Sequence, residues 1–119
     1  AIEMWTRRFE LDAVAPMLHA VRNHLPMFAG RVVPGTRSDV PQLPAIVERG
    51  RAMMTVFLDR AEPHFARNPF AAGADVSVAD ITGFFAVRMT GALDWDISQS
   101  HPGIARWFSA LAARPAFQL

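Results

Sequence analysis

Val76-Ser77-Val78-Ala79-Asp80-Ile81 predicts the start of a helix on which the rest of the architecture depends. If Ser77 precedes the first turn, its hydroxyl can accept the backbone N–H of Asp80, while the Asp80 carboxylate accepts that of Ser77. Val76 and Ile81 have the spacing of a hydrophobic staple, which packs a side chain before the cap against one in the helix. We therefore expect a fully capped helix from Val78.

The helix that follows, to about Leu93, is apolar on all sides. A helix of this kind is surrounded by others, so we expect it to be the innermost element of the domain. Arg88 is its only charged residue after Asp80. We expect Arg88 to be a core arginine paired with an acid such as Asp94 or Asp96, with an anion site as the alternative.

The residues from Ile2 to about Leu25 predict a first helix with two apolar rows. We expect one row to form the core: Leu11, Val14, Leu18, Val21 and Leu25. The other lies nearly opposite and is expected to face a second neighbour: Trp5, Phe9, Ala13, Pro16 and Ala20. Pro16 lacks an N–H and crowds the preceding turn, so a bend is expected there.

Two more helices are expected, from Pro44 to about Pro63 and from Pro102 to Arg114. Gly50 lies inside the apolar stripe of the former and indicates close approach of another backbone, and Pro63 is expected to mark its fraying end. Residues 26–42 are rich in Gly and Pro and predict a long loop that folds over a neighbouring surface or site. We find no strand-like alternation, so the predicted fold is all-α.

Length and composition indicate one cytoplasmic domain that spans residues 1–119. All 12 basic residues are arginines, interspersed with acids, and the net charge is only +1, so no nucleic-acid partner is expected. No apolar run is long enough to span a membrane, and the start lacks the pattern of a signal peptide. The helical pattern already runs at Ala1 without a cap, which suggests that further sequence once preceded it.

Few residues are candidates for chemistry. The chain has no cysteine, and His19 and His24 are five apart, off-register for two metal ligands on one helix face, so no metal site is expected. Ser77 and Asp80 could form a catalytic pair, but the motif contains no histidine and we interpret it as a cap. We expect His64 and His101 to lie near helix ends without a catalytic role.

Three segments together resemble the C-terminal domain of the glutathione transferase superfamily, particularly its bacterial members, and their order and spacing cover nearly the whole chain. They are Ile2-Glu3-Met4-Trp5-Thr6-Arg7-Arg8-Phe9-Glu10-Leu11, then Gly73-Ala74-Asp75-Val76-Ser77-Val78-Ala79-Asp80-Ile81, then His101-Pro102-Gly103-Ile104-Ala105-Arg106-Trp107-Phe108 with Arg114-Pro115.

The resemblance implies a bundle of about five helices that packs beside a thioredoxin-like N-terminal domain, which this chain lacks. That domain would hold glutathione, the co-substrate, and the residue that activates its thiol, so this chain has no cofactor of its own and is expected to be inactive alone. The parent protein would conjugate glutathione to small apolar electrophiles, acting in detoxification as a homodimer joined through its first two helices.

The resemblance also implies roles for individual residues. The pocket for the electrophile would be walled by Phe9, Asp12, Ala13 and Pro16, with Trp5 and Arg8 nearer the cleft or the dimer partner. Ser77 and Asp80 match the structural helix cap of the family. Two alternatives remain: a non-catalytic dimerisation or interaction module of the same family, and an unrelated helical ligand-binding domain with a helix-turn-helix segment upstream.

Overall fold

The computed structural model describes residues 1–30, 32 and 40–118, and this part of the chain is helical with no strand. The main helices are α1 (Ile2–Arg8), α2 (Ala15–His24), α3 (Pro44–Arg67), α4 (Val78–Ala92) and α5 (Pro102–Ala112). A π-helical turn, η1 (Phe9–Val14), joins α1 to α2, and two single 3₁₀ turns cover Pro26–Phe28 and Pro115–Phe117. The all-α prediction is confirmed.

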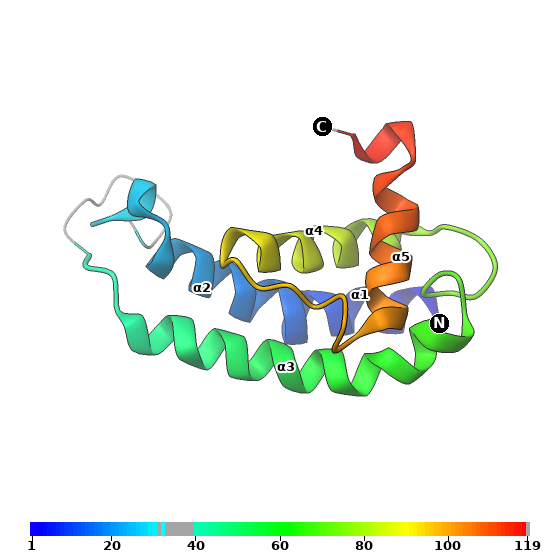
Figure 1. Ribbon diagram of the computed structural model, residues 1–119, viewed down its shortest axis with the longest axis horizontal. Helices are drawn as coiled ribbons and strands as arrows, with labels where there is room; N and C mark the ends of the chain where they lie inside the picture. Colours follow the sequence, from blue (N-terminus) through cyan, green and yellow to red (C-terminus); the bar gives the residue numbers. More distant parts are fainter. Residues whose placement is uncertain (31, 33–39, 119) are drawn as a thin grey trace.

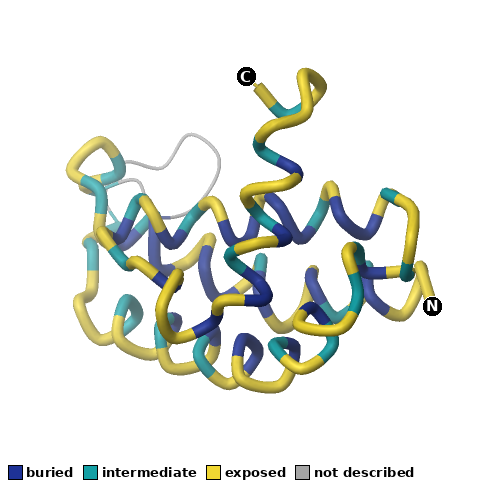
Figure 2. Tube along the Cα trace, turned by 45° about the vertical axis from the view of Figure 1, so that its right-hand side comes forward, coloured by how far each residue is buried: buried dark blue, intermediate teal, exposed yellow. Residues whose placement is uncertain are grey.

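The described residues form four long helices, because α1, η1 and α2 run on from one another as one helix, called here the first helix. The first helix and α3 lie along the long axis, α4 runs beside the first helix, and α5 crosses the others near the N-terminal end (Figure 1). The molecule is elongated, with extents of 46 × 27 × 24 Å. Buried residues follow the inner sides of the helices as one continuous core (Figure 2).

The core row of the first helix is the one that we expected to face a second neighbour. Trp5, Phe9, Ala13, Met17 and Ala20 are buried. Of the predicted core stripe, Val21 is buried and Val14 and Leu25 pack against the core, but Leu11 and Leu18 are 66% and 44% exposed, so the prediction is wrong for these two. Aromatic packing explains the choice: the Phe9 ring stacks on Trp107 at 5.7 Å and contacts Phe57 at 5.4 Å between ring centroids. These large rings fill the centre where α3 and α5 cross, and aliphatic side chains on the opposite face cannot reach it.

The π-helical turn explains how that row stays on one side. In an α-helix, steps of four residues advance the side-chain direction by about 40° each, so Trp5, Phe9, Ala13 and Met17 would drift around the axis. The wider turn at Phe9–Val14 takes up one extra residue and cancels that drift. The sequence predicted a bend at Pro16, whereas the irregularity that the structure shows is a π-helical turn that ends two residues before it.

Helix α3 continues past Pro63 to Arg67, so the predicted end at Pro63 is wrong. Pro63 is exposed, so the Asp59 carbonyl that loses its N–H partner can face water, and Phe65 is buried beyond it and holds the last turn in place. Gly50 confirms the expected close approach: a Cβ there would lie 2.7 Å from the Pro16 carbonyl oxygen.

Helix α4 begins after Ser77 as predicted, but it is not surrounded on all sides. Val78, Ile81 and Phe85 are exposed on one face, because the other helices cover α4 only on its opposite side. Arg88 is also exposed, so the expectation of a core arginine is wrong. The loop predicted over residues 26–42 lies partly outside the described residues; in its described part, the Gln42 amide donates to the carbonyls of Arg22 and Leu25.

Candidate functional site

The predicted capping box is present at the start of α4, with Asp80 at its centre. The Asp80 carboxylate is fully buried and accepts the backbone N–H of Ser77 at 2.9 Å, the backbone N–H of Ala71 at 2.9 Å and the indole N–H of Trp107 at 2.8 Å. The first bond was foreseeable from spacing; the other two join the loop before α4 and the middle of α5. Asp80 thus joins three segments: the loop before α4, the start of α4 and the middle of α5.

The residues proposed for the electrophile pocket do not share one surface. Phe9 and Ala13 are 1% and 0% exposed, and Pro16 is buried against Gly50, so these three lie inside the domain's own core. Asp12 is exposed. Phe9, Ala13 and Pro16 present no exposed side chain to a ligand, because the ring of Phe9 packs between α3, α4 and α5, and the assignment of Asp12 stays a prediction.

The residues placed near the cleft or the dimer partner form a pair. The indole of Trp5 is buried among Phe9, Phe65 and His64, and the guanidinium of Arg8 lies over its ring, 4.4 Å from the centroid. Trp5 is therefore a core residue, and Arg8 covers its ring from the outer side.

Two grooves flank the first helix. The α3 groove, between the first helix and α3, has two parts that share Met53; its lining residues are Arg8, Leu11, Asp12, Ala15, Pro16, His19, Ile46, Arg49, Gly50, Met53, Val56, Phe57 and Arg60. The α4 groove, between the first helix and α4, is lined by Val14, Leu18, Phe85, Arg88, Met89 and Ala92. The stripe that the sequence placed in the core thus contributes Leu11 to one groove and Val14 and Leu18 to the other.

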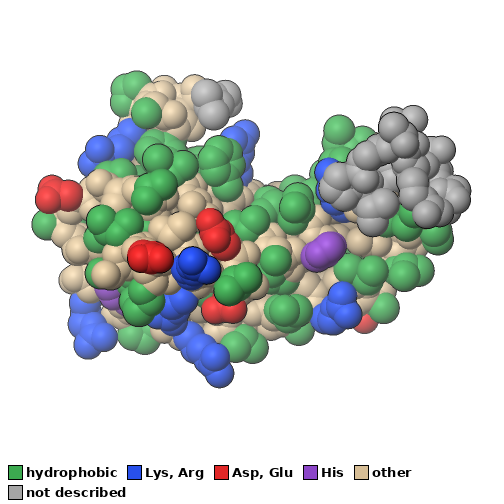
Figure 3. Space-filling view, turned by 180° about the vertical axis from the view of Figure 1, so that it is seen from behind, with side chains coloured by type: hydrophobic (Ala, Val, Ile, Leu, Met, Phe, Trp, Pro, Cys, Tyr) green, Lys and Arg blue, Asp and Glu red, His purple; other side chains and the backbone are tan. Residues whose placement is uncertain are grey.

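The two grooves differ in polarity. Five of the six residues that line the α4 groove are apolar, whereas the α3 groove carries three arginines and one aspartate among apolar side chains. On the back of the molecule as seen in Figure 1, acidic and basic side chains lie close together, with hydrophobic side chains around them (Figure 3). That face has both signs of charge and no one-signed field.

His101 forms a link that the sequence did not reveal. Its ring is buried, with Nε2 2.7 Å from the Asp59 carboxylate and Nδ1 2.8 Å from the Ser100 hydroxyl. A serine, a histidine and an aspartate in a row suggest nucleophilic catalysis, but the nearby N–H groups of Gly103 and Ile104 already donate to the Glu62 carboxylate at 2.7 and 2.9 Å. Because these donors are occupied, the cluster ties α5 to α3.

His64 also has a structural contact, since its Nε2 lies 2.8 Å from the carbonyl oxygen of Ala71. Among the residues that the structure describes, no three His, Cys, Asp or Glu side chains gather as metal ligands would. In the same part of the chain, no helix combines the length and the apolar character needed to cross a bilayer.

Residues 42–115, which cover α3, α4 and α5, match the profile of the family described as "Glutathione S-transferase, C-terminal domain". The chain belongs to this family. The capping box, with Asp80 joined to Trp107, therefore lies inside the matched region of a glutathione S-transferase C-terminal domain.

Individual relatives agree with the assignment. Over 76 residues the domain is 34% identical to glutathione S-transferase 3 of Zea mays, a match that covers 62% of this chain and 34% of the maize protein. It also resembles a solved glutathione S-transferase of class Gtt2 from Vibrio parahaemolyticus, with 26% identity and a TM-score of 0.75. That match covers 98% of this chain and 48% of the Vibrio chain.

The structure of Gtt2 from Saccharomyces cerevisiae has the same fold, with a TM-score of 0.80 at 18% identity, over 98% of this chain and 53% of the yeast chain. This glutathione S-transferase C-terminal domain thus spans about a third of the maize relative and about half of each solved chain.

Proposed function

We propose that residues 1–119 form the helical domain of a glutathione transferase-like protein and that the parent protein conjugates glutathione to small apolar electrophiles. The observation that carries the proposal is the uncovered α4 groove, on a domain that spans about half of the solved chains it resembles. Glutathione and the group that activates its thiol would be held by a thioredoxin-like N-terminal domain. No residue of this chain would be the primary catalyst.

The α4 groove is the proposed contact with that domain. Leu18 and Phe85 are 44% and 47% exposed there, and a permanent interface is generally more apolar than a transient one. Ile81 and Val78 extend the exposed apolar face along α4 toward the capping box. A partner that covers this face would surround α4 on all sides, which accounts for its uniformly apolar sequence.

The part of the α3 groove lined by Arg8, Asp12, Met53, Val56 and Arg60 is the proposed surface for a second copy of the chain. Two-fold contacts place the same patch on both subunits, so a patch that carries both signs of charge can complement itself. Arg8 and Arg60 lie in the same stretch of the groove as Asp12, and Met53 and Val56 add exposed apolar surface between them. This arrangement supports a homodimer with arginine–aspartate contacts across the axis.

The wall of the electrophile pocket is proposed on the outer side of the first helix. Of the four residues first assigned to it, Asp12 alone has an exposed side chain. Phe9, Ala13 and Pro16 would support the wall from behind, and the exposed Leu11 and Ala15 would supply its apolar surface. An apolar wall beside a bound thiolate would speed conjugation by holding the electrophile close to the sulfur.

The test compares the 119-residue chain with the longer protein that includes the thioredoxin-like half. We expect no detectable glutathione binding or conjugation by the chain alone, and conjugation of an activated aryl chloride by the longer protein. Leu18→Arg in the longer protein should reduce conjugation at least tenfold, because a charge in the apolar α4 groove weakens the domain contact. Met27→Arg, at an exposed residue outside both grooves, is the control.

Robust turnover by the 119-residue chain would contradict the proposal. A longer protein that forms dimers but conjugates no electrophile would favour the alternative, a non-catalytic dimerisation or interaction module.

A further inference from the structure

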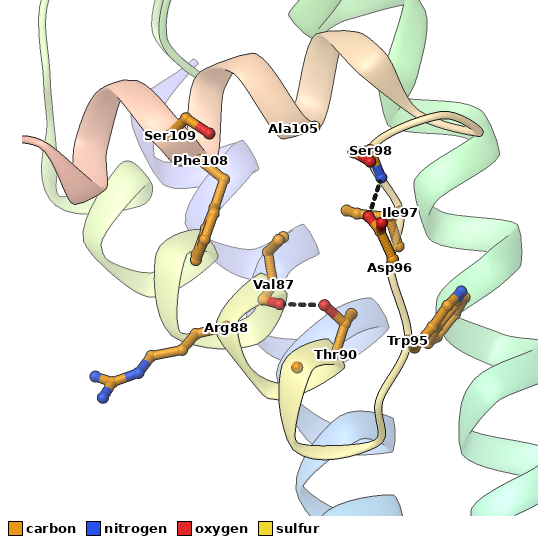
Figure 4. A pocket seen from close by; sticks show the side chains of 11 residues that line it. Val87, Arg88, Thr90, Trp95, Asp96, Ile97, Ser98, Ala105, Phe108 and Ser109 are labelled. Atoms are coloured by element: carbon orange, nitrogen blue, oxygen red, sulfur yellow. Dashed lines mark hydrogen bonds between the residues drawn. The ribbon is translucent and has the colours of Figure 1, made fainter.

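A cavity separate from both grooves lies between the C-terminal half of α4, the segment after it and the outer side of α5 (Figure 4). Its lining residues come from these three elements: Val87, Arg88, Thr90, Gly91, Trp95, Asp96, Ile97, Ser98, Ala105, Phe108 and Ser109. Nothing in the proposed function uses it, except that Arg88 also borders the α4 groove.

The floor of this cavity is apolar and well supported. Val87 and Ile97 are buried in the core cluster, and the Phe108 ring is stacked on Phe84 with 4.7 Å between centroids. The hydroxyl of Thr90 donates to the Val87 carbonyl at 2.7 Å, so it presents no unsatisfied polar group to a ligand. The volume is ≈ 220 Å³, while an apolar cavity of about 150 Å³ can hold benzene. One aromatic ring with a short chain therefore fits.

The segment that closes the cavity is held in place from outside it. The Arg51 guanidinium of α3 lies 4.8 Å from the centroid of the Trp95 ring and reaches the Leu93 carbonyl at 3.5 Å. The Asp96 carboxylate accepts the backbone N–H of Ser98 at 2.8 Å, which fixes the turn. The rim therefore has this conformation without a bound ligand.

The rim is also acidic. Its acid is Asp96, and within the described residues no cation lies at ion-pair distance from this carboxylate. The hydrogen bond from the Ser98 backbone, and to a lesser extent the one from its side chain, lowers the pKa of Asp96. Its carboxylate is therefore ionised at neutral pH. The one cationic residue of the lining, Arg88, directs its guanidinium away from the cavity, on the side opposite Asp96 (Figure 4).

Gly91 adds an independent indication. It lies inside α4, where glycine costs about 1 kcal/mol relative to alanine, yet its φ is not positive and a Cβ there would meet nothing within 4 Å. Packing and backbone geometry therefore do not require a glycine at this position. Because Gly91 is one of the lining residues, we attribute the glycine to open space that the cavity requires there.

We propose that this cavity binds a small organic cation, with one aromatic ring on the Val87–Ile97–Phe108 floor and an ammonium group beside the Asp96 carboxylate. The ring contributes apolar contact, and the exposed carboxylate sets the sign of the charge that is accepted. Binding through a single ring and one screened ion pair gives a Kd of about 1 mM.

The test titrates the uniformly ¹⁵N-labelled 119-residue chain with phenethylamine, which is a cation at neutral pH, and follows the three indole N–H signals. The chain carries Leu18→Arg and Met53→Arg, outside the cavity lining, to prevent association through the two grooves. We expect the Trp95 signal to shift and saturate, while those of Trp5 and Trp107, buried in the core away from the cavity lining, stay in place. The anion 3-phenylpropionate, of similar shape, should bind at least fivefold more weakly.

Variants test separately how the ring contact and the charge of the carboxylate contribute to binding. Ala105→Leu fills the cavity from α5 and should weaken phenethylamine binding at least fivefold, whereas Ala110→Leu, at an exposed position of the same helix, should leave the Kd unchanged. Asp96→Asn should raise the Kd about two- to fivefold. If Ala105→Leu fails to fold by thermal melting, Ser109→Leu, at the exposed edge of the lining, replaces it.

Three outcomes would overturn the proposal. One is a Trp95 signal that stays unmoved at 20 mM phenethylamine. Another is equal or tighter binding of 3-phenylpropionate, which would assign recognition to Arg88. The last is an unchanged Kd in the cavity-filling variant.

Discussion

Asp80 is a buried carboxylate whose loss removes more than a helix cap. Besides the Ser77 N–H, it accepts the N–H groups of Ala71 and Trp107, and both would be left buried without an acceptor. A lost cap costs about 1–2 kcal/mol, and each unsatisfied buried donor adds about 1–3 kcal/mol. We therefore expect Asp80→Ala to lower the free energy of unfolding by about 3 kcal/mol or more, measured by urea denaturation.

Two matched variants show which part of that loss belongs to the cap. Ser77→Ala removes the serine hydroxyl and should cost about 1 kcal/mol, while Asp75→Ala, at an exposed acid just before the motif, should cost less than about 0.5 kcal/mol. If Asp80→Ala costs no more than Ser77→Ala, the bonds to Ala71 and Trp107 contribute little.

Only part of this arrangement could be predicted from the sequence. The bond between Asp80 and Ser77 joins residues three apart, and helix capping has a fixed spacing. The indole of Trp107 is 27 residues away, and Glu62 meets the start of α5 from 41 residues away. No local pattern encodes such distances, because they depend on where α5 crosses the other helices.

At the scale of the helix, three of the glycines inside helices, at positions 50, 83 and 91, can be compared directly. A Cβ at Gly50 would lie 2.7 Å from the Pro16 carbonyl oxygen, one at Gly83 would overlap the Phe9 ring, and one at Gly91 would meet open space. We expect alanine at position 50 or 83 to destabilise the chain by about 1–3 kcal/mol, and Gly91→Ala to stabilise it by about 0.5–1 kcal/mol.

Thermal or urea unfolding of the three variants measures these effects on one scale. Stabilisation by alanine at position 50 would contradict the contact with Pro16, because the gain in helix propensity would then outweigh any clash.

The first helix shows why periodicity alone could not identify the core. Its sequence contains two apolar rows, and both bury surface: one inside this chain, and the other, by the proposal above, against a partner. The row with regular three- and four-residue spacing looked more like a core stripe, but Leu11 and Leu18 are exposed. Burial in an interface leaves the same pattern as burial in a core, and the π-helical turn made the true core row look irregular.

At the scale of the molecule, the uncovered grooves predict how the chain behaves alone. We expect the isolated chain to form assemblies larger than a dimer as its concentration rises, because both grooves are free to associate. Leu18→Arg in the α4 groove should stop association at the dimer, and Met53→Arg in the α3 groove should remove the dimer itself.

Sedimentation velocity over a range of concentrations distinguishes these species, and Met27→Arg serves as the control for an added surface charge. A wild-type chain that stays monomeric throughout would indicate that neither groove needs to be covered.

The overall architecture was more predictable than the site. The all-α class, the starts of α3, α4 and α5 and the close approach at Gly50 follow from local signals of proline, glycine and capping. The burial of Phe9 could not be predicted from local signals, because it depends on how α3, α4 and α5 pack together around its ring.

The π-helical turn at Phe9–Val14 gives the first helix one place where its length is adjustable. Elsewhere in a helix, removing a single residue rotates everything beyond it by about 100°, which would turn Met17 and Ala20 out of the core. If one residue is removed within this turn, the turn becomes ordinary α-helix. The spacing between successive core side chains then alternates between three and four residues. A homologue one residue shorter here would keep the same side chains inward.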